Sequence, residues 1–249
     1  MYIINDGIRL NAQLDMPDKN VSKCPVAVII HGFTGHMEER HIVSVAQAIR
    51  ALGCATLRVD MYGHGHSDGT FREHTLYKWL TNALCVIDYA RALDFATDIY
   101  LCGHSQGGLT AVLAAALKHD QISALIPMSP ALMIPQLARD GELLGLSFDP
   151  DHIPDDLKSW DGRLLSGNYA RVAQTIDVDK AIDRYQGPVL IVHGDADEVV
   201  PIRCIQDAAA RYTHCDLKLI PGDTHCYDHH LDQATAAVSD WLRPLVSKA

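Results

Sequence analysis

Ser105 stands at the centre of the pattern Gly-x-Ser-x-Gly, residues 103–107, in which a serine can act as a nucleophile. The pattern follows an apolar run at residues 99–102 and precedes an Ala/Leu-rich run at residues 109–117. A strand, a sharp turn and a helix in this order form a nucleophile elbow, where glycines let strand and helix approach closely. The helix N-terminus behind the hydroxyl favours negative charge. Ser105 is therefore the predicted nucleophile.

An acid and a base follow the serine along the chain, each after a predicted strand. The strand at residues 189–192 leads to His-Gly-Asp-Ala-Asp, which offers Asp195 and Asp197. Asp197 lies further past the strand end, where it can reach a histidine, whereas we expect Asp195 to hold the turn through its own backbone. The strand at residues 217–220 leads to Pro-Gly-Asp-Thr-His, which ends at His225. Parallel strands bring such loops to one edge of a sheet, so this order predicts a Ser-Asp-His triad and a serine hydrolase.

Two backbone N–H groups are predicted to bind the oxyanion that forms when the serine attacks a carbonyl. One belongs to Gln106, the residue after the nucleophile. The other belongs to Phe33, in the loop His-Gly-Phe-Thr-Gly that follows the apolar run at residues 25–30. Loss of one such donor typically lowers the rate by about 10²–10³. Phe33 and Gln106 therefore form the predicted oxyanion hole.

A metal site is the alternative for the cluster His225, Asp228, His229 and His230. The pair His225 and His229 has the spacing of H-E-x-x-H, but the glutamate is missing and no fourth ligand is near. We therefore expect no metal and no cofactor. His229 and His230 are expected on a helix face or as buried polar residues.

Strands and helices alternate along most of the chain. We expect strands at residues 25–30, 54–59, 99–102, 122–128, 189–192 and 217–220, after an antiparallel hairpin at residues 2–16. We expect helices at residues 38–52, 75–93, 109–117, 202–212 and 227–245. This alternation predicts an α/β fold with a mostly parallel, twisted sheet and helices on both faces.

The alternation breaks between Pro130 and Gly187, where the chain has no clean buried strand. Connections this long are usually functional. We expect a cap insertion at about residues 131–187, placed over the sheet edge that carries Ser105, within a single domain spanning residues 1–249. A solvated excursion on another face is the alternative.

The composition is that of an ordinary globular protein, with 48% hydrophobic and 21% charged residues. The formal net charge of −10 argues against nucleic acid or an anionic membrane as a partner. We find neither a signal peptide nor an apolar run of the roughly 20 residues that a membrane span needs. The 7 cysteines lack a C-x-x-C pair and suit free thiols, so a cytoplasmic location is expected. The oligomeric state stays open, with a homodimer among the alternatives.

The chain resembles the α/β-hydrolase superfamily over essentially its whole length. Residues 60–67, Asp-x-x-Gly-His-Gly-x-Ser, are similar to a loop of its esterases, lipases and acyl-peptidase relatives. More narrowly, residues 31–36, 103–108 and 222–226 resemble the bacterial cinnamoyl (feruloyl) esterases. So do residues 148–154, Phe-Asp-Pro-Asp-His-Ile-Pro, which bear most on the substrate because they lie outside the catalytic core.

The resemblance implies hydrolysis of hydroxycinnamate esters (feruloyl, p-coumaroyl or caffeoyl) through an acyl-enzyme intermediate and without a cofactor. In that group the insertion covers the acyl pocket. A planar aromatic acyl group needs an aromatic wall and a polar partner for its ring hydroxyl. Trp160 is the predicted wall and the Tyr169 hydroxyl the predicted polar contact. The alternative is that each residue only anchors the cap to its own small core.

Other functions stay open. Leu132, Met133, Ile134 and Leu137 in the insertion would suit an esterase or lipase for aliphatic acyl esters such as monoacylglycerols. An acyltransferase, in which an alcohol replaces water, is chemically adjacent. A non-catalytic binding protein on the same scaffold is the remaining alternative, because a fold alone does not prove a function.

Overall fold

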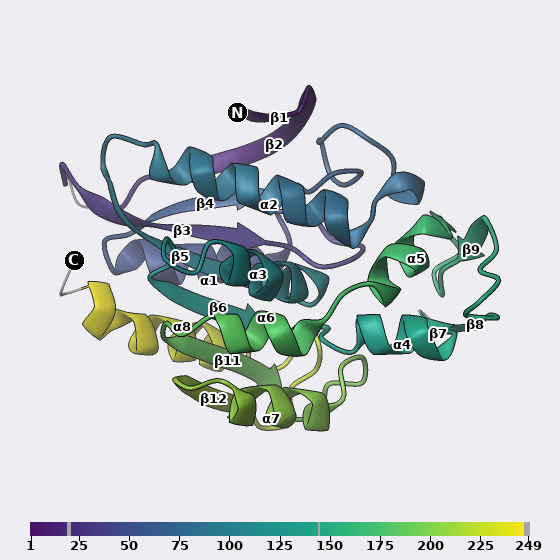
Figure 1. Cartoon of the computed structure of the whole chain (residues 1–249). Coiled ribbons are helices and arrows are strands. Elements are labelled where there is room, and N and C mark those ends of the chain that lie inside the picture. The colour runs from purple at the N-terminus through teal and green to yellow at the C-terminus, as the bar shows by residue number, and fades with distance from the viewer. Residues whose placement is uncertain (19–20, 144, 247–249) are drawn as a thin grey trace.

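The computed structural model describes residues 1–18, 21–143 and 145–246 (Figure 1). Its central strands are β1 (Tyr2–Asn5), β2 (Ile8–Asp15), β3 (Cys24–Ile30), β4 (Ala55–Val59), β5 (Ala96–His104), β6 (Ala124–Met128), β11 (Val189–Gly194) and β12 (Cys215–Ile220). They form one sheet in the order β1-β2-β4-β3-β5-β6-β11-β12. The pairs β1–β2 and β2–β4 are antiparallel and the remaining neighbours are parallel. The mostly parallel sheet predicted from the sequence is confirmed.

Helices cover both faces of this sheet. Its helices are α1 (Arg40–Ala51), α2 (Leu76–Arg91), α3 (Gln106–Leu117), α6 (Val178–Arg184), α7 (Ile202–Arg211) and α8 (Leu231–Val246). Helices α1 and α8 share one hydrophobic cluster with the sheet, while α2, α3, α6 and α7 belong to the cluster on the other face. Figure 1 shows α2, α3, α6 and α7 in front of the strands.

The central strands are buried on both faces, and β3 is accordingly a continuous apolar run. All seven residues of β3 are buried, as are all five of β4 and all six of β11. Helix α3 lies between the sheet and its neighbours, and each residue from Gln106 to Ala116 is buried. The elements that carry the predicted nucleophile are therefore packed on every side.

The predicted insertion, described at residues 131–143 and 145–187, holds only short elements in those ranges. It contains α4 (Ile134–Asp140), the hairpin β7 (Glu142–Leu143) with β8 (Leu146–Ser147), the hairpin β9 (Asp156–Lys158) with β10 (Leu164–Ser166), then α5 (Asn168–Gln174) and α6. Figure 1 places α4, α5 and the hairpins to the right of the sheet, whereas α6 packs on α3. Helix α6 therefore belongs to the layer of helices, with α2, α3 and α7, that covers one face of the sheet.

One boundary differs from the sequence prediction in a way that matters for the site. The last helix begins at Leu231, not at residue 227, because Tyr227 adopts a left-handed conformation (φ 60°). Its buried hydroxyl donates to the Val192 carbonyl at 3.0 Å, which anchors the turn to the sheet. His229 is exposed and His230 half-buried, so the prediction of a helix face or buried polar residues is wrong for this pair.

Candidate active site

Ser105 occupies a sharp turn between β5 and α3. Its φ of 55° and ψ of −120° lie outside the usual regions for a residue with a side chain, as a nucleophile elbow requires. The close approach of the two elements depends on Gly103, where an added Cβ would lie 2.2 Å from the Gly107 carbonyl oxygen. The Ser105 N–H donates to the Met128 carbonyl at 2.9 Å. These contacts fix the serine at the carboxyl edge of the sheet.

Asp197 and His225 meet at the same edge. His225 Nδ1 donates to Asp197 Oδ2 at 2.8 Å, across the loops that follow β11 and β12. The other carboxylate oxygen accepts the N–H groups of Val199 (2.8 Å) and Val200 (2.9 Å). Burial acts to raise the pKa of Asp197, but the bonds from His225 and from these two N–H groups outweigh it, so its pKa lies below the ordinary value. Asp197 is thus a charged acceptor that fixes the His225 ring.

The loop that carries His225 is held by two further aspartates. The fully buried Asp223 accepts the N–H groups of His229 (3.0 Å) and His230 (3.2 Å). Asp195 accepts the Gly222 N–H at 2.6 Å, so the prediction that it holds its own turn is wrong: it joins two loops. Sequence reasoning gave Asp223 no role. The sequence feature that could have indicated a role for Asp223 is its position two residues before the predicted base, His225.

The Phe33 loop is braced by buried histidines. His64 Nε2 donates to the Phe33 carbonyl. His31 Nδ1 donates to the Gly32 carbonyl at 2.8 Å, while His31 Nε2 accepts the Met61 N–H at 3.0 Å. Burial is the main cause that lowers the pKa of His31, to about 3, so this ring is neutral and keeps one donor and one acceptor. His31 lies in the loop predicted to carry the oxyanion donor, whereas His64 lies in a motif that the sequence marked only by resemblance.

Asp60 holds the motif at residues 60–67 against this loop. Its carboxylate accepts the Met37 N–H at 2.8 Å, the His66 N–H at 3.0 Å and the Asn11 side-chain amide at 2.9 Å. Burial would raise the pKa of Asp60, but these three bonds bring it below the ordinary value. The motif therefore acts as a charged, hydrogen-bonded brace for the loop of the predicted oxyanion donor.

Trp160 and Tyr169 both reach the Phe33 ring from the insertion. The Trp160 ring centroid lies 5.5 Å from that of Phe33 at an interplanar angle of 33°. Trp160 is 62% exposed, at the turn of the β9–β10 hairpin. The Tyr169 ring lies edge-on to Phe33 at 5.7 Å. The insertion therefore places two aromatic rings beside the loop of the predicted oxyanion donor.

The Tyr169 hydroxyl has a partner that the sequence did not predict. Tyr169 is fully buried, and its hydroxyl donates to Gln106 Oε1 at 2.6 Å. Burial raises the pKa of this phenol far above its ordinary value, so it stays protonated and remains a donor. The hydroxyl expected to meet a substrate ring instead links the insertion to the residue after Ser105.

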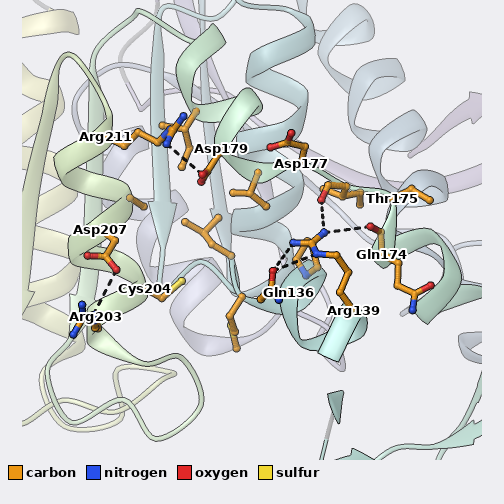
Figure 2. A pocket seen from close by; sticks show the side chains of 17 residues that line it. Gln136, Arg139, Gln174, Thr175, Asp177, Asp179, Arg203, Cys204, Asp207 and Arg211 are labelled. Carbon is orange, nitrogen blue, oxygen red and sulfur yellow. Dashed lines mark hydrogen bonds and ion pairs between the residues drawn. The ribbon is translucent and has the colours of Figure 1, made fainter. Parts of the chain in front are cut away.

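A separate groove of about 910 Å³ lies between α4, α6 and α7 (Figure 2). It contains no residue of the predicted triad, oxyanion hole or aromatic acyl pocket, but Leu132 and Met133 are among the residues that line it. Its arginines have partners within the chain. Arg211 pairs with Asp179 and Asp183, and Arg139 donates to the carbonyls of Gln174 and Ile176. These bonds tie the parts of the insertion to each other and to α7.

No group of three or more His, Cys, Asp or Glu side chains within the described ranges is placed to hold a metal ion. Among the helices of those same ranges, none has the length and apolar character to cross a membrane. All seven cysteines are free thiols.

A family model described as Hydrolase_4, serine aminopeptidase S33, matches residues 22–154. The chain belongs to this family, and with the fold described above it is a serine hydrolase of the α/β-hydrolase class.

Three individual proteins to which the chain is similar bear on its substrate. The chain is similar to Est1E from Butyrivibrio proteoclasticus, solved with ferulic acid bound, at 62% identity and a TM-score of 0.98, with 99% of each chain covered. The human mitochondrial palmitoyl-protein thioesterase ABHD10 is 25% identical over 83% of this chain and 69% of its own. A monoacylglycerol lipase from Mycolicibacterium smegmatis is 25% identical over 88% of this chain and 86% of its own.

Proposed function

We propose that this protein is a carboxylic ester hydrolase that cleaves hydroxycinnamate esters, with feruloyl, p-coumaroyl or caffeoyl acyl groups. The observation that carries the substrate class is its 62% identity, over 99% of both chains, to Est1E, which was solved with ferulic acid bound. The aromatic side chains of Phe33 and Trp160 support it, because a flat aromatic acyl group gains most from aromatic walls.

The proposed mechanism uses three side chains and two backbone groups. His225, oriented by the bond from its Nδ1 to Asp197, accepts the Ser105 proton through Nε2 as the hydroxyl attacks the ester carbonyl. The backbone N–H groups of Phe33 and Gln106 stabilise the oxyanion. His225 then gives the proton to the departing alcohol, which leaves an acyl-enzyme. Water, activated by the same imidazole, releases the acid.

The insertion is proposed to act as a cap that selects the acyl group. Trp160 is proposed as the wall of the acyl pocket, because its exposed ring is close to Phe33 and can still lose surface to a ligand. Tyr169 is proposed to shape the pocket with its ring, since its hydroxyl is bonded to Gln106. The whole chain, residues 1–249, is proposed to be one domain with the cap inserted at about residues 131–187.

The deciding experiment compares two methyl esters with the purified protein. We expect kcat/KM for methyl ferulate to exceed that for methyl octanoate at least about tenfold, since each aromatic contact contributes roughly 0.5–1.5 kcal/mol beyond burial. Release of ferulate is followed by absorbance and release of octanoate by titration. A preference for the octanoate ester would contradict the substrate class while leaving the serine hydrolase intact.

A second candidate is an esterase for aliphatic acyl chains such as monoacylglycerols. It is favoured by the buried Leu132 and the half-buried Met133, which directly follow Ala131, whose N–H donates to the Ser105 carbonyl at 3.0 Å. The similarity to a monoacylglycerol lipase points the same way. Hydrolysis of 1-monooctanoylglycerol faster than methyl ferulate would favour this candidate.

We also propose a cellular location and an assembly for the protein. A cytoplasmic location is supported by the seven free thiols, since oxidising compartments favour disulfides. Cell fractionation tests it. We propose a homodimer as the assembly. Light scattering after size-exclusion chromatography distinguishes a homodimer from a monomer.

A further inference from the structure

Three histidines from distant parts of the chain form a line of hydrogen bonds behind the predicted active site. His104, the last residue of β5, places Nδ1 3.1 Å from Nε2 of His41 on α1. Its other ring nitrogen, Nε2, lies 2.9 Å from the backbone carbonyl oxygen of His225. His41 and His104 are buried, 5% and 3% exposed, so water does not compete for these bonds.

The partners fix where each proton sits. A carbonyl oxygen only accepts, so His104 Nε2 must carry the hydrogen. Burial, together with the neighbouring histidines, lowers the pKa of His104 well below its ordinary value, and the ring is neutral. Its Nδ1 is then an acceptor, and His41 must donate through Nε2. Burial likewise lowers the pKa of His41, to about 4. The Oε2 atom of Glu39 lies 3.9 Å from the same His41 nitrogen, too far for a hydrogen bond, so His104 is the partner of that N–H.

The position of His104 couples two loops that must cooperate. His104 directly precedes Ser105, and β5 is separated from β12, whose loop carries His225, by β6 and β11. The His104 ring also packs on the His225 ring, with centroids 4.8 Å apart at 47°. A hydrogen bond to the backbone and a ring contact together restrain where the His225 imidazole can lie.

We propose that His104, held in one orientation by His41, is a positioning residue that sets the distance between Ser105 and the His225 imidazole. It takes no part in the bond-making steps of the proposed mechanism. Proton transfer demands a heavy-atom separation of about 2.6–3.2 Å, and a misplacement of about 1 Å can cost about 10²-fold in rate. The neighbouring Gly32 belongs to the same arrangement, because a Cβ there would lie 3.2 Å from His104 Nδ1 and 3.3 Å from the Ser105 Cβ.

The test compares His104→Leu with His104→Gln. Glutamine keeps an N–H donor near the position of the imidazole Nε2, whereas leucine fills similar space without one. We expect His104→Leu to lower kcat for methyl ferulate about 10–100-fold with KM within about twofold, and His104→Gln to recover to within about fivefold of the wild type. Equal losses in both variants, a change in KM alone, or full activity of His104→Leu would overturn the proposal.

His41 provides a second pair that keeps the proposal testable if His104→Leu does not fold. His41→Leu removes the donor to His104 and should lower kcat about 3–10-fold, while His41→Gln should restore it. Equal kcat values for the two His41 variants would contradict the inference. Thr56→Val replaces a buried hydroxyl on β4 by an isosteric methyl group; it controls for the loss of a buried polar group away from the site and should leave kcat unchanged. Thermal unfolding is recorded for all variants.

The inference rests on the proposed triad but not on the acyl group. The rate of Ser105 labelling by a fluorophosphonate reports the serine–histidine pair without any ester substrate. We expect labelling to slow in parallel with kcat in His104→Leu. A wild-type protein that labels rapidly but ignores methyl ferulate would refute the substrate class and leave the His104 comparison valid.

Discussion

Ser105, Asp197 and His225 follow β5, β11 and β12, strands of six to nine residues inside one sheet. Trp160 and Tyr169 come from the insertion, where the hairpin strands have two or three residues and α5 has seven. The first region is anchored by buried backbone and side-chain hydrogen bonds. The second presents an indole that is 62% exposed.

The two regions are therefore expected to serve two different steps of ester hydrolysis, the chemistry and the selection of the acyl group. Chemistry needs atoms held to within a fraction of an ångström, which packed strands supply. Acyl selection needs only a surface of the right shape, and short elements can change that surface without disturbing the sheet. Substitutions in the first region should therefore lower kcat, and those in the insertion should act mainly on KM and on the choice of ester.

The largest expected effect comes from Ser105→Ala. Removal of a triad nucleophile typically costs about 10⁶-fold in kcat. We expect hydrolysis of every ester tested to disappear while the thermal unfolding midpoint changes little, because the hydroxyl has only a small surface. Steady-state assays with methyl ferulate and a fluorophosphonate label check this. Retained hydrolysis would remove the serine from the mechanism.

Asp197→Asn should be next, with kcat lowered about 10⁴-fold. An amide that donates toward His225 Nδ1 favours the wrong tautomer of the imidazole. Asp195→Asn is the matched control on the same loop, because that carboxylate bonds the Gly222 N–H and not His225. A loss of similar size in both variants would mean that the loop, and not the Asp197 carboxylate, is what matters.

The pH profile of kcat/KM should show the protonation of a single group on its acid side. Only a neutral imidazole can accept the serine proton, so kcat/KM should fall about tenfold for each pH unit on the acid side of the profile. Asp197, with its pKa below the ordinary value, stays charged in that range and adds no second proton. Rates with methyl ferulate across pH 4–8 check the slope. A fall of about 10² per unit would show that Asp197 titrates together with the base.

The two regions also differ in how far the sequence could predict them. The elbow follows from local pattern, since the glycines at 103 and 107 and the flanking apolar runs already require a strand, a turn and a helix. Parallel topology then brings the loops with Asp197 and His225 to the same edge. The start of α8 at Leu231 could not be predicted, because apolar spacing does not reveal the left-handed conformation of Tyr227 or the hydrogen bonds to Asp223.

Contacts across the fold were the least predictable. Tyr169 and Gln106 are 63 residues apart, and only the packed structure shows that the hydroxyl is used internally. The bond between His104 and the His225 carbonyl spans 121 residues and involves the backbone of its partner, which carries no residue-type signal. Trp160 could be singled out because it is the only tryptophan of the insertion.

Trp160→Ala tests the insertion as a selector. We expect KM for methyl ferulate to rise about tenfold with kcat nearly unchanged, since the ring would lose an aromatic wall but the triad would be untouched. Methyl octanoate should be affected less. Leu164→Ala, a 52% exposed apolar side chain on the same hairpin, is the control. An equal effect of both substitutions on both esters would contradict a specific role for the indole.

Tyr169→Phe probes the point where the two regions meet and should have the smallest effect. The ring keeps its contact with Phe33, but the bond to Gln106 Oε1 is lost, and a hydrogen bond is worth about 0.5–1.5 kcal/mol net. If that bond steadies the start of α3, where the Gln106 N–H is the proposed oxyanion donor, kcat should fall about 3–10-fold at constant KM. A substrate contact by the hydroxyl would instead raise KM for methyl ferulate more than for methyl cinnamate, which lacks the ring hydroxyl. A fall in kcat would therefore assign the Tyr169 hydroxyl to the chemistry, and a selective rise in KM would assign it to acyl recognition.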